Sequence, residues 1–150
     1  MKARKGWTLI ELLVVLAIIG VLATIVMPYY WEARHRAMAA RIVADYNTVR
    51  VSALSYHATN DVLPVTSAWG TVPPEMKTTL PDSFAFTFPN YDFRWQVWSG
   101  TELGGEFANS GLVAGLEVRS TDARLIQALQ RTYQGRLIAA TPDQVTMLIQ

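Results

Sequence analysis

Residues 7–27 read WTLIELLVVLAIIGVLATIVM, and 17 of these 21 residues are hydrophobic. As an α-helix this stretch would be about 31 Å long, roughly the thickness of the hydrocarbon core of a bilayer. A helix also pairs its backbone polar groups within the segment, as a lipid environment requires. The stretch therefore predicts a single membrane-spanning helix, and a plain anchor is the simplest interpretation of its hydropathy.

The flanks of this stretch bear on its orientation and processing. Three basic residues precede it and predict a cytoplasmic N-terminus: Lys2, Arg4 and Lys5. Three more follow it and weaken the asymmetry: Arg34, Arg36 and Arg41. An ordinary secretory signal fits poorly, because its apolar region runs about 7–15 residues and ends at a small-residue cleavage site. Here Met27-Pro28-Tyr29-Tyr30 follows the longer run.

One carboxylate, Glu11, lies inside the apolar stretch, four residues after Trp7. A carboxylate in a membrane helix costs about 2.5 kcal/mol or more, so Glu11 is a functional candidate. Residues 7–27 contain no cation to pair with it. A cut between Gly6 and Trp7 would create an α-ammonium one helical turn from Glu11, in the same chain or in a neighbour.

The motif Lys5-Gly6-Trp7-Thr8-Leu9-Ile10-Glu11, followed by the apolar run, resembles the class III signal of type IV pilins and type II secretion pseudopilins. The family pattern is a short basic leader ending in Gly, a hydrophobic residue that is usually Phe, and then Thr-Leu-Ile-Glu. This chain has Trp7 in place of the usual Phe. Gly20 and Pro28 fall where many members carry a helix-weakening Gly and Pro.

The resemblance implies processing and assembly. Residues 1–6 would be a leader, and a prepilin peptidase would cut after Gly6 and N-methylate Trp7. Residues 7–27 would then pack with other pilins or pseudopilins in a hetero-filament, in which Glu11 neutralises the N-terminus of a neighbour. The other implied partners are membrane lipid before assembly and, indirectly, an inner-membrane assembly platform and a cytoplasmic ATPase.

The implied location is the inner membrane, crossed once, with the N-terminus in the cytoplasm and residues 28–150 in the periplasm. After assembly the subunit would be part of the filament. Residues 28–59 are expected to continue the helix, because apolar residues recur at helical spacing. This stripe is predicted to pack against the C-terminal part of the chain: Trp31, Met38, Ile42, Tyr46, Val49, Ala53 and Tyr56.

Residues 60–150 are expected to form a β-rich head. Residues 61–83 hold four prolines and predict an irregular but packed connection, pinned by Trp69, Val72, Met76 and Leu80. The period then changes to two, which predicts a hairpin of residues 84–88 and 91–97 around Pro89-Asn90. A Gly-rich loop over 99–111 leads to a third strand over 112–118.

A short helix and a final hairpin complete the predicted head. Ser120 or Thr121, with Asp122, would start the helix and Gly135 would stop it. Its apolar face holds Leu125, Ile126, Leu129 and Tyr133. Strands over 136–140 and 144–149 would pair around Thr141-Pro142-Asp143. The predicted fold class is α+β: a long N-terminal helix continuing into a small pilin-like head of antiparallel strands with one short helix.

Other candidate sites in the head have structural explanations. An aromatic cluster could stack sugars or bases, but its alternation predicts a buried face: Phe84, Phe86, Phe88, Tyr91, Phe93, Trp95 and Trp98. Trp98 is off the main face and is the best candidate for an exposed contact. A formal charge of +1 and the absence of a basic run in the head argue against nucleic acid.

The sequence contains no recognisable catalytic or metal motif. The two histidines, His35 and His57, lie 22 residues apart on one predicted helix, about 33 Å, and cannot share a site. We expect His35, beside Arg34 and Arg36, to be an interfacial or filament-packing residue. The chain has no cysteine, which excludes thiolate zinc sites, and no dense acidic loop typical of calcium sites. Neither a cofactor nor an enzymatic activity is expected.

The most specific functional prediction is a structural subunit of a type II secretion pseudopilus, in a minor position, that helps to drive protein export. The absence of the C-terminal cysteine pair common in major type IV pilins favours it, as does the order of three strands, helix and hairpin. The alternative within the class is a minor type IV or competence pilin. A membrane-tethered binding module and an anchored enzyme are further alternatives.

Overall fold

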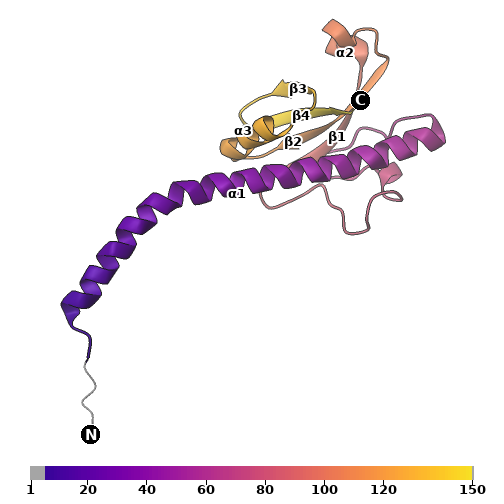
Figure 1. The fold of residues 1–150 in the computed structure, drawn as a ribbon. Coiled ribbons are helices and arrows are strands. Elements are labelled where there is room, and N and C mark those ends of the chain that lie inside the picture. Colours follow the sequence, from indigo (N-terminus) through magenta and orange to yellow (C-terminus); the bar gives the residue numbers. More distant parts are fainter. Residues whose placement is uncertain (1–5, 150) are drawn as a thin grey trace. The chain divides into compact units, whose positions relative to one another are not determined.

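The computed structural model describes residues 6–149. Within them the chain divides into two compact units, the first ending at His35 and the second beginning at Arg36. Figure 1 shows the elements in chain order. The helices are α1 (Leu9–Asn60), η1 (Pro74–Met76, a 3₁₀ turn), α2 (Gly100–Leu103), η2 (Gly105–Phe107, a 3₁₀ turn) and α3 (Ala123–Thr132). The strands are β1 (Asp92–Ser99), β2 (Leu112–Arg119), β3 (Leu137–Ala140) and β4 (Gln144–Ile149).

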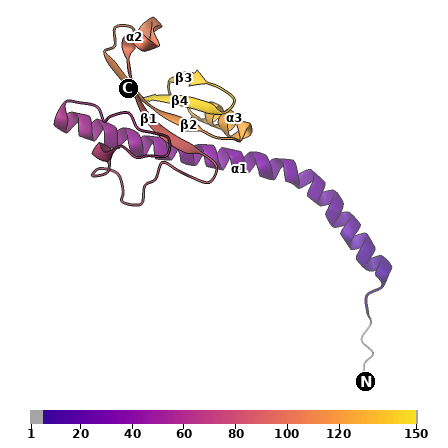
Figure 2. The ribbon, with the colours of Figure 1, turned by 180° about the vertical axis from the view of Figure 1, so that it is seen from behind.

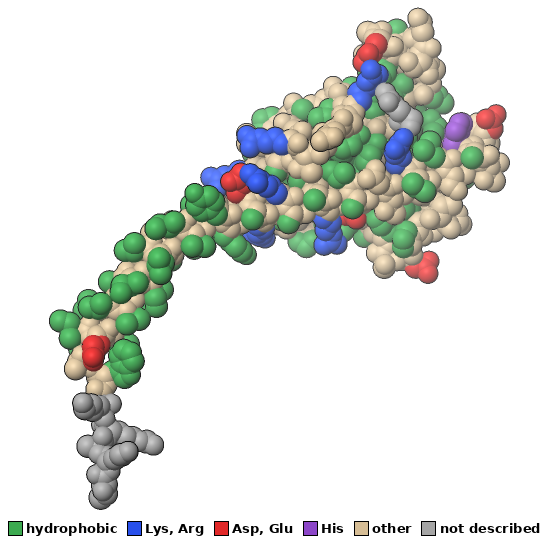
Figure 3. All heavy atoms as spheres, in the orientation of Figure 1, with side chains coloured by type: hydrophobic (Ala, Val, Ile, Leu, Met, Phe, Trp, Pro, Cys, Tyr) green, Lys and Arg blue, Asp and Glu red, His purple; other side chains and the backbone are tan. Residues whose placement is uncertain are grey.

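The first unit is built from the N-terminal part of α1, and its apolar side chains are exposed. Leu9, Leu16 and Val26 are each more than half exposed, and this holds for most of the large apolar residues up to Met27. Figure 3 shows hydrophobic side chains over the described part of this unit. Among the described residues, α1 is the one helix long and apolar enough to cross a membrane. The predicted long helix is confirmed, and α1 continues through Pro28.

The second unit packs the C-terminal part of α1 against an antiparallel sheet of order β1-β2-β4-β3 (Figures 1 and 2). The helix contributes Ile42, Tyr46 and Val49 to the core, as its spacing predicted. The other α1 residues of the stripe fall into two groups: Ala53 is buried and Met38 and Tyr56 are half-buried. Trp31 was wrongly included, because it belongs to the first unit and is 41% exposed.

The sheet contributes aromatic and aliphatic residues to the core that it forms with α1 and α3. Phe93 and Trp95 of β1, Leu116 of β2 and Met147 of β4 are fully buried in this core. The predicted apolar face of α3 is also confirmed, since Leu125, Ile126 and Leu129 are buried and Tyr133 packs against the core. Asp122 caps α3 by accepting a hydrogen bond from the Arg124 amide at 3.0 Å.

The predicted strand over residues 84–88 is wrong. That segment is not a strand: it makes an isolated bridge between Thr87 and Asp92, and β1 begins at Asp92. Two backbone hydrogen bonds accompany the bridge, from the Phe88 amide to the Tyr91 carbonyl at 3.0 Å and from the Phe93 amide to the Phe86 carbonyl at 2.7 Å.

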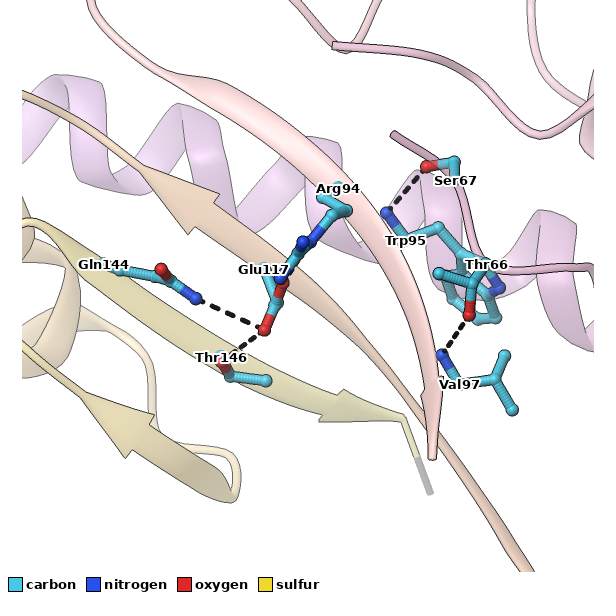
Figure 4. A network of polar contacts seen from close by, with 8 residues as sticks. All are labelled: Thr66, Ser67, Arg94, Trp95, Val97, Glu117, Gln144 and Thr146. Carbon is cyan, nitrogen blue, oxygen red and sulfur yellow. Dashed lines mark hydrogen bonds and ion pairs between the residues drawn. The ribbon is translucent and has the colours of Figure 1, made fainter. Parts of the chain in front are cut away.

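The connection before this segment occupies the rest of the β1 edge. Ser67 donates its amide to the Trp95 carbonyl at 2.9 Å, and Gly70 donates to the Phe93 carbonyl at 2.8 Å. Two amides of β1 donate in return to side-chain hydroxyls, Trp95 to Ser67 and Val97 to Thr66, both at 3.1 Å (Figure 4).

Two smaller predictions also need correction. The Gly-rich segment 99–111 is not only loop, because it contains α2 and η2. Gly135 does not stop α3, since the helix ends at Thr132 with Tyr133 as its C-cap. Gly135 is not among the glycines with left-handed φ. The β3–β4 hairpin is confirmed, although its register shifts between Leu137 and Ala139.

The glycine in the middle of β2 provides a test of this packing. A Cβ on Gly115 would lie 2.9 Å from the Met147 carbonyl oxygen and 3.1 Å from the Trp98 ring. Because the nearer atom is backbone of the paired strand, Gly115→Ala should lower the free energy of unfolding by about 1–3 kcal/mol. Urea unfolding of the full chain in detergent measures it. Ala139→Val, at an exposed position of β3, should change stability by less than about 0.5 kcal/mol; equal effects of the two would contradict this packing.

Alkaline pH should destabilise the second unit. Burial, followed by the nearby Asp45 carboxylate, raises the pKa of Tyr91 to about 12, and burial also raises the pKa of Tyr46. Unfolded tyrosines ionise near pH 10. The neutral phenols therefore contribute stability that is complete below about pH 10 and is lost as pH rises towards 12.

The part of this loss due to Tyr91 should be on the order of 2 kcal/mol. Urea unfolding at pH 9 and pH 11.5, followed by the tryptophan emission maximum, measures it. Tyr91→Phe removes the ionisable group and one 3.3 Å hydrogen bond to Asp45, so its stability should depend less on pH. An unchanged pH dependence in Tyr91→Phe would refute the assignment.

Candidate functional site

The start of α1 brings together the predicted processing and assembly residues. The helix begins at Leu9, so Thr8 is its N-cap and Glu11 its third residue. Glu11 Oε2 accepts hydrogen bonds from the Thr8 amide at 2.8 Å and from the Thr8 hydroxyl at 2.7 Å. The Glu11 amide donates to Thr8 Oγ1 at 3.3 Å. These reciprocal bonds form a capping box, which turns the Glu11 carboxylate back towards the beginning of the helix.

This geometry gives Glu11 a role in helix initiation that its apolar surroundings did not reveal. The spacing Thr-x-x-Glu at positions 8–11 is the signature of a capping box, and it was readable in the sequence. A carboxylate near a helix N-terminus also interacts favourably with the unpaired amides there. Glu11 therefore lies at the end of the helix where a new N-terminus at Trp7 would appear.

The predicted scissile bond, between Gly6 and Trp7, lies outside the helix. Both residues precede Leu9 and both are exposed, with Trp7 at 77%. A Cβ built on Gly6 would meet no atom within 4 Å. Exposed, non-helical backbone is the form that a peptidase can bind. The rest of the predicted leader, residues 1–5, is outside the described residues.

The two helix-weakening residues share one face of α1 with a threonine that sequence reasoning missed. Gly20, Thr24 and Pro28 are spaced four apart, and α1 is continuous through all three. The Thr24 hydroxyl donates to the Val21 carbonyl at 2.6 Å. Pro28 has no amide to donate one turn back, and hydroxyl bonding of this kind locally loosens a helix. Gly20 leaves open space, because a Cβ there would meet no atom within 4 Å.

The aromatic residues of the head form its core. Phe86, Phe93 and Trp95 are fully buried, and Tyr91 is 6% exposed. The Phe86 and Phe93 rings meet edge-on, with their centroids 5.9 Å apart. Trp98 is half-buried, with its ring over Gly115 of the neighbouring strand. The cluster is therefore a packing element, as predicted, and Trp98, the best candidate for an exposed contact, is partly covered.

The most buried carboxylate of the head, Glu117, belongs to a polar network on the sheet (Figure 4). It forms an ion pair with Arg94, its direct cross-strand partner, and accepts from Gln144 Nε2 at 3.2 Å and Thr146 Oγ1 at 3.4 Å. Trp69 packs beside this network, with its ring 4.7 Å from the Arg94 guanidinium and 4.5 Å from that of Arg119. The network ties Trp69 and three strands together, and its satisfied carboxylate indicates a structural role.

The histidines do not form a site. His35 is buried, whereas His57 is exposed. Within residues 6–149, no three His, Cys, Asp or Glu side chains are grouped so that they could hold a metal ion.

The N-terminal segment matches the model of the prokaryotic N-terminal methylation motif over residues 1–27. The chain is 46% identical over 55 residues to a fimbrial protein of Pseudomonas aeruginosa, covering 37% of this chain and 36% of that protein. It is 48% identical over 45 residues to a type IV major alpha-pilin of Moraxella bovis, covering 30% and 28% respectively. It is 41% identical over 49 residues to the type IV major fimbrial protein FimA of Dichelobacter nodosus, covering 33% and 31%.

The chain thus matches about a third of the length of these curated relatives. No solved structure matches it. The methylation motif and the pilin relatives support membership of the type IV pilin-like family, and the α+β fold is pilin-like.

Proposed function

We propose that the protein is a structural, non-enzymatic subunit of a type IV pilin-like filament. The observation that carries this proposal is the methylation motif over residues 1–27, which implies processing by a prepilin peptidase and assembly with other pilin-like subunits. Residues 1–6 are the leader, the cut falls between Gly6 and Trp7, and the new amino group of Trp7 is methylated. The exposed, non-helical backbone at this bond supports the assignment.

In this proposal the chain has three working parts after cleavage. Residues 7–27 cross the inner membrane first and form the filament core later, and their exposed apolar side chains suit both environments. Gly20 and Pro28 loosen the helix when residues 7–27 move from the membrane into the filament core. Residues 28–150 lie on the periplasmic side, with the helix continuing over 28–59 and the β-rich head over 60–150.

Glu11 is the assembly residue. In the single subunit its Oε2 atom is satisfied by Thr8 at the start of α1. In a filament core, which excludes water, an isolated carboxylate would be costly, and the α-ammonium at Trp7 of a neighbour is the matching charge. A pair of this kind forms only at one stagger between subunits. It therefore selects the packing register as well as neutralising the carboxylate.

Mass spectrometry of the mature N-terminus tests the processing step. The expected chain begins with N-methyl-Trp7, which requires both the cut after Gly6 and the methyl transfer. Gly6→Val should block the cut, because a side chain then stands at the scissile bond, whereas Ala139→Val, at a distant exposed position, should be processed normally. A wild-type chain that retains Met1 or Lys2 would refute the filament proposal and favour a membrane-tethered binding module.

Substitution of Glu11 tests the assembly step. Glu11→Ala and Glu11→Gln should still insert and be cleaved, but their amount in sheared filaments should fall at least tenfold. This is a minimum, because losing one partner of a buried ion pair costs about 3–5 kcal/mol. Glu32→Gln, on the same helix but outside the apolar run, is the matched control and should assemble normally. Filament incorporation of both Glu11 variants at the wild-type level would eliminate this role.

Two filament systems are candidates for this subunit. The absence of cysteine favours a minor position in a type II secretion pseudopilus, connected indirectly to an inner-membrane platform and a cytoplasmic ATPase. The names of the relatives, which are fimbrial proteins and major pilins, favour a type IV pilus. Deletion of the gene separates the two: loss of secreted enzymes from the medium supports the first, and loss of twitching or DNA uptake supports the second.

A further inference from the structure

We propose that Tyr29, Tyr30 and Trp31, which we call the aromatic belt, bind the phospholipid headgroup layer together with Arg34. In this role they fix the depth of α1 in the bilayer before assembly. The inference rests on the proposed function in one respect, that residues 7–27 span the membrane. It adds a lipid-binding surface immediately beyond that span, which neither the apolar run nor the motif defines.

The belt side chains are open to their surroundings. Tyr29 is 71% exposed, Tyr30 59% and Trp31 41%. Large aromatic side chains stabilise a protein strongly when they are buried, so three exposed ones in a row call for an explanation. They directly follow the apolar run and Pro28 in α1. Tyrosine and tryptophan have an apolar ring and one polar group, and they concentrate where a bilayer changes from hydrocarbon to headgroups.

The arrangement of the three rings distinguishes a lipid interface from a protein interface. Successive residues of an α-helix are about 100° apart, so three in a row cover about 200° of its circumference. A helix that packs on one partner repeats its contact residues every three or four positions. Three consecutive aromatic residues therefore fit a headgroup layer that surrounds the helix better than a protein partner that packs on one face.

The axial spacing also fits. The start of α1 at Leu9, just after Trp7, and the belt are 20 to 22 residues apart, which corresponds to about 30–33 Å of helix. The hydrocarbon core is about 30 Å thick. Trp7 can therefore lie at the cytoplasmic interface while the belt lies at the opposite one.

Arg34 supplies charge complementarity to lipid phosphates. Its guanidinium lies 5.5 Å from the centroid of the Trp31 ring, and its Cα is about 4.5 Å further along the helix axis than that of Trp31. A long arginine side chain just beyond a membrane span can hold its charge among the headgroups. Glu32 lies in the same turn, so we expect Arg34 to give a moderate preference for anionic lipid and the rings to dominate the depth.

Depth measurement by electron paramagnetic resonance tests the belt. The chain contains no cysteine, so Ala33→Cys introduces a single site for a nitroxide label at an exposed position. The labelled full chain is placed in vesicles of phosphatidylcholine and phosphatidylglycerol. The relative access of oxygen and a nickel chelate then reports the depth of the label.

Replacing the belt by Tyr29→Leu, Tyr30→Leu and Trp31→Leu should move the label about 3–5 Å towards the hydrocarbon. The apolar run then extends by three residues, each adding about 1.5 Å. The matched control, Tyr29→Trp with Tyr30→Trp, keeps aromatic rings and should leave the depth unchanged. Tyr29→Leu with Tyr30→Leu alone should give an intermediate shift, which provides a second measurement if the triple variant inserts poorly.

The same depth in wild type and both leucine variants would overturn the proposal. Unchanged depth combined with loss of filament incorporation would also overturn it, because the rings would then contact a neighbouring subunit. Arg34→Gln should lower the association of spin-labelled phosphatidylglycerol, relative to phosphatidylcholine, by up to about fivefold. An unchanged ratio would remove Arg34 from the site. None of these measurements depends on the cut after Gly6 or on Glu11, so this proposal and the proposed function can fail separately.

Discussion

The exposed apolar surface of residues 9–27 is the constraint on which the rest of the molecule depends. Side chains such as Leu16 and Val26 are more than half exposed in the subunit, and leaving them in water would cost about 25 cal/mol for each Å² of apolar area. In the proposed function, a bilayer removes that cost before assembly and a filament core removes it afterwards. The apolar part of α1 would then be shielded from water in both environments.

One helix, α1, carries both the exposed apolar surface and part of the buried core of the head. The environment of its side chains changes along its length. Up to His35 the large apolar residues are exposed, whereas in the second unit Ile42, Tyr46 and Val49 are fully or almost fully buried against the sheet. The second group packs on the chain's own β-strands, whereas the first has no such partner among the described residues. In the proposed function, lipid or other subunits cover the first group.

A loop covers one edge of the sheet, that of β1. An open strand edge invites pairing with other chains, and residues 66–70 cover the edge of β1 with backbone and hydroxyl hydrogen bonds. Trp69, beside the Arg94 and Arg119 guanidinium groups, fixes that loop on the sheet. The partly buried pair of Arg94 with Glu117 joins the same network across β1 and β2. A proline-rich connection thereby becomes part of the sheet's structure.

Sequence alone determined the elements whose signals are local. The apolar run, the helical stripe in α1 and the apolar face of α3 all depend on residues within a few turns of one another. The capping-box spacing of Thr8 and Glu11 is equally local, but it was not predicted. The alternation of Phe84, Phe86 and Phe88 correctly identified rings that pack on the core, with Phe86 fully buried, but it did not identify the backbone pairing. Periodicity reports which side chains face the core and not which backbone segments pair. Only the tertiary structure decided that residues 66–70 take the edge of β1, that β4 lies between β2 and β3, and that Glu117 meets Arg94. Each of these features depends on the register between segments that are distant in the sequence. Several pairings would bury a similar apolar area, and the specific hydrogen bonds and ion pairs select one of those pairings.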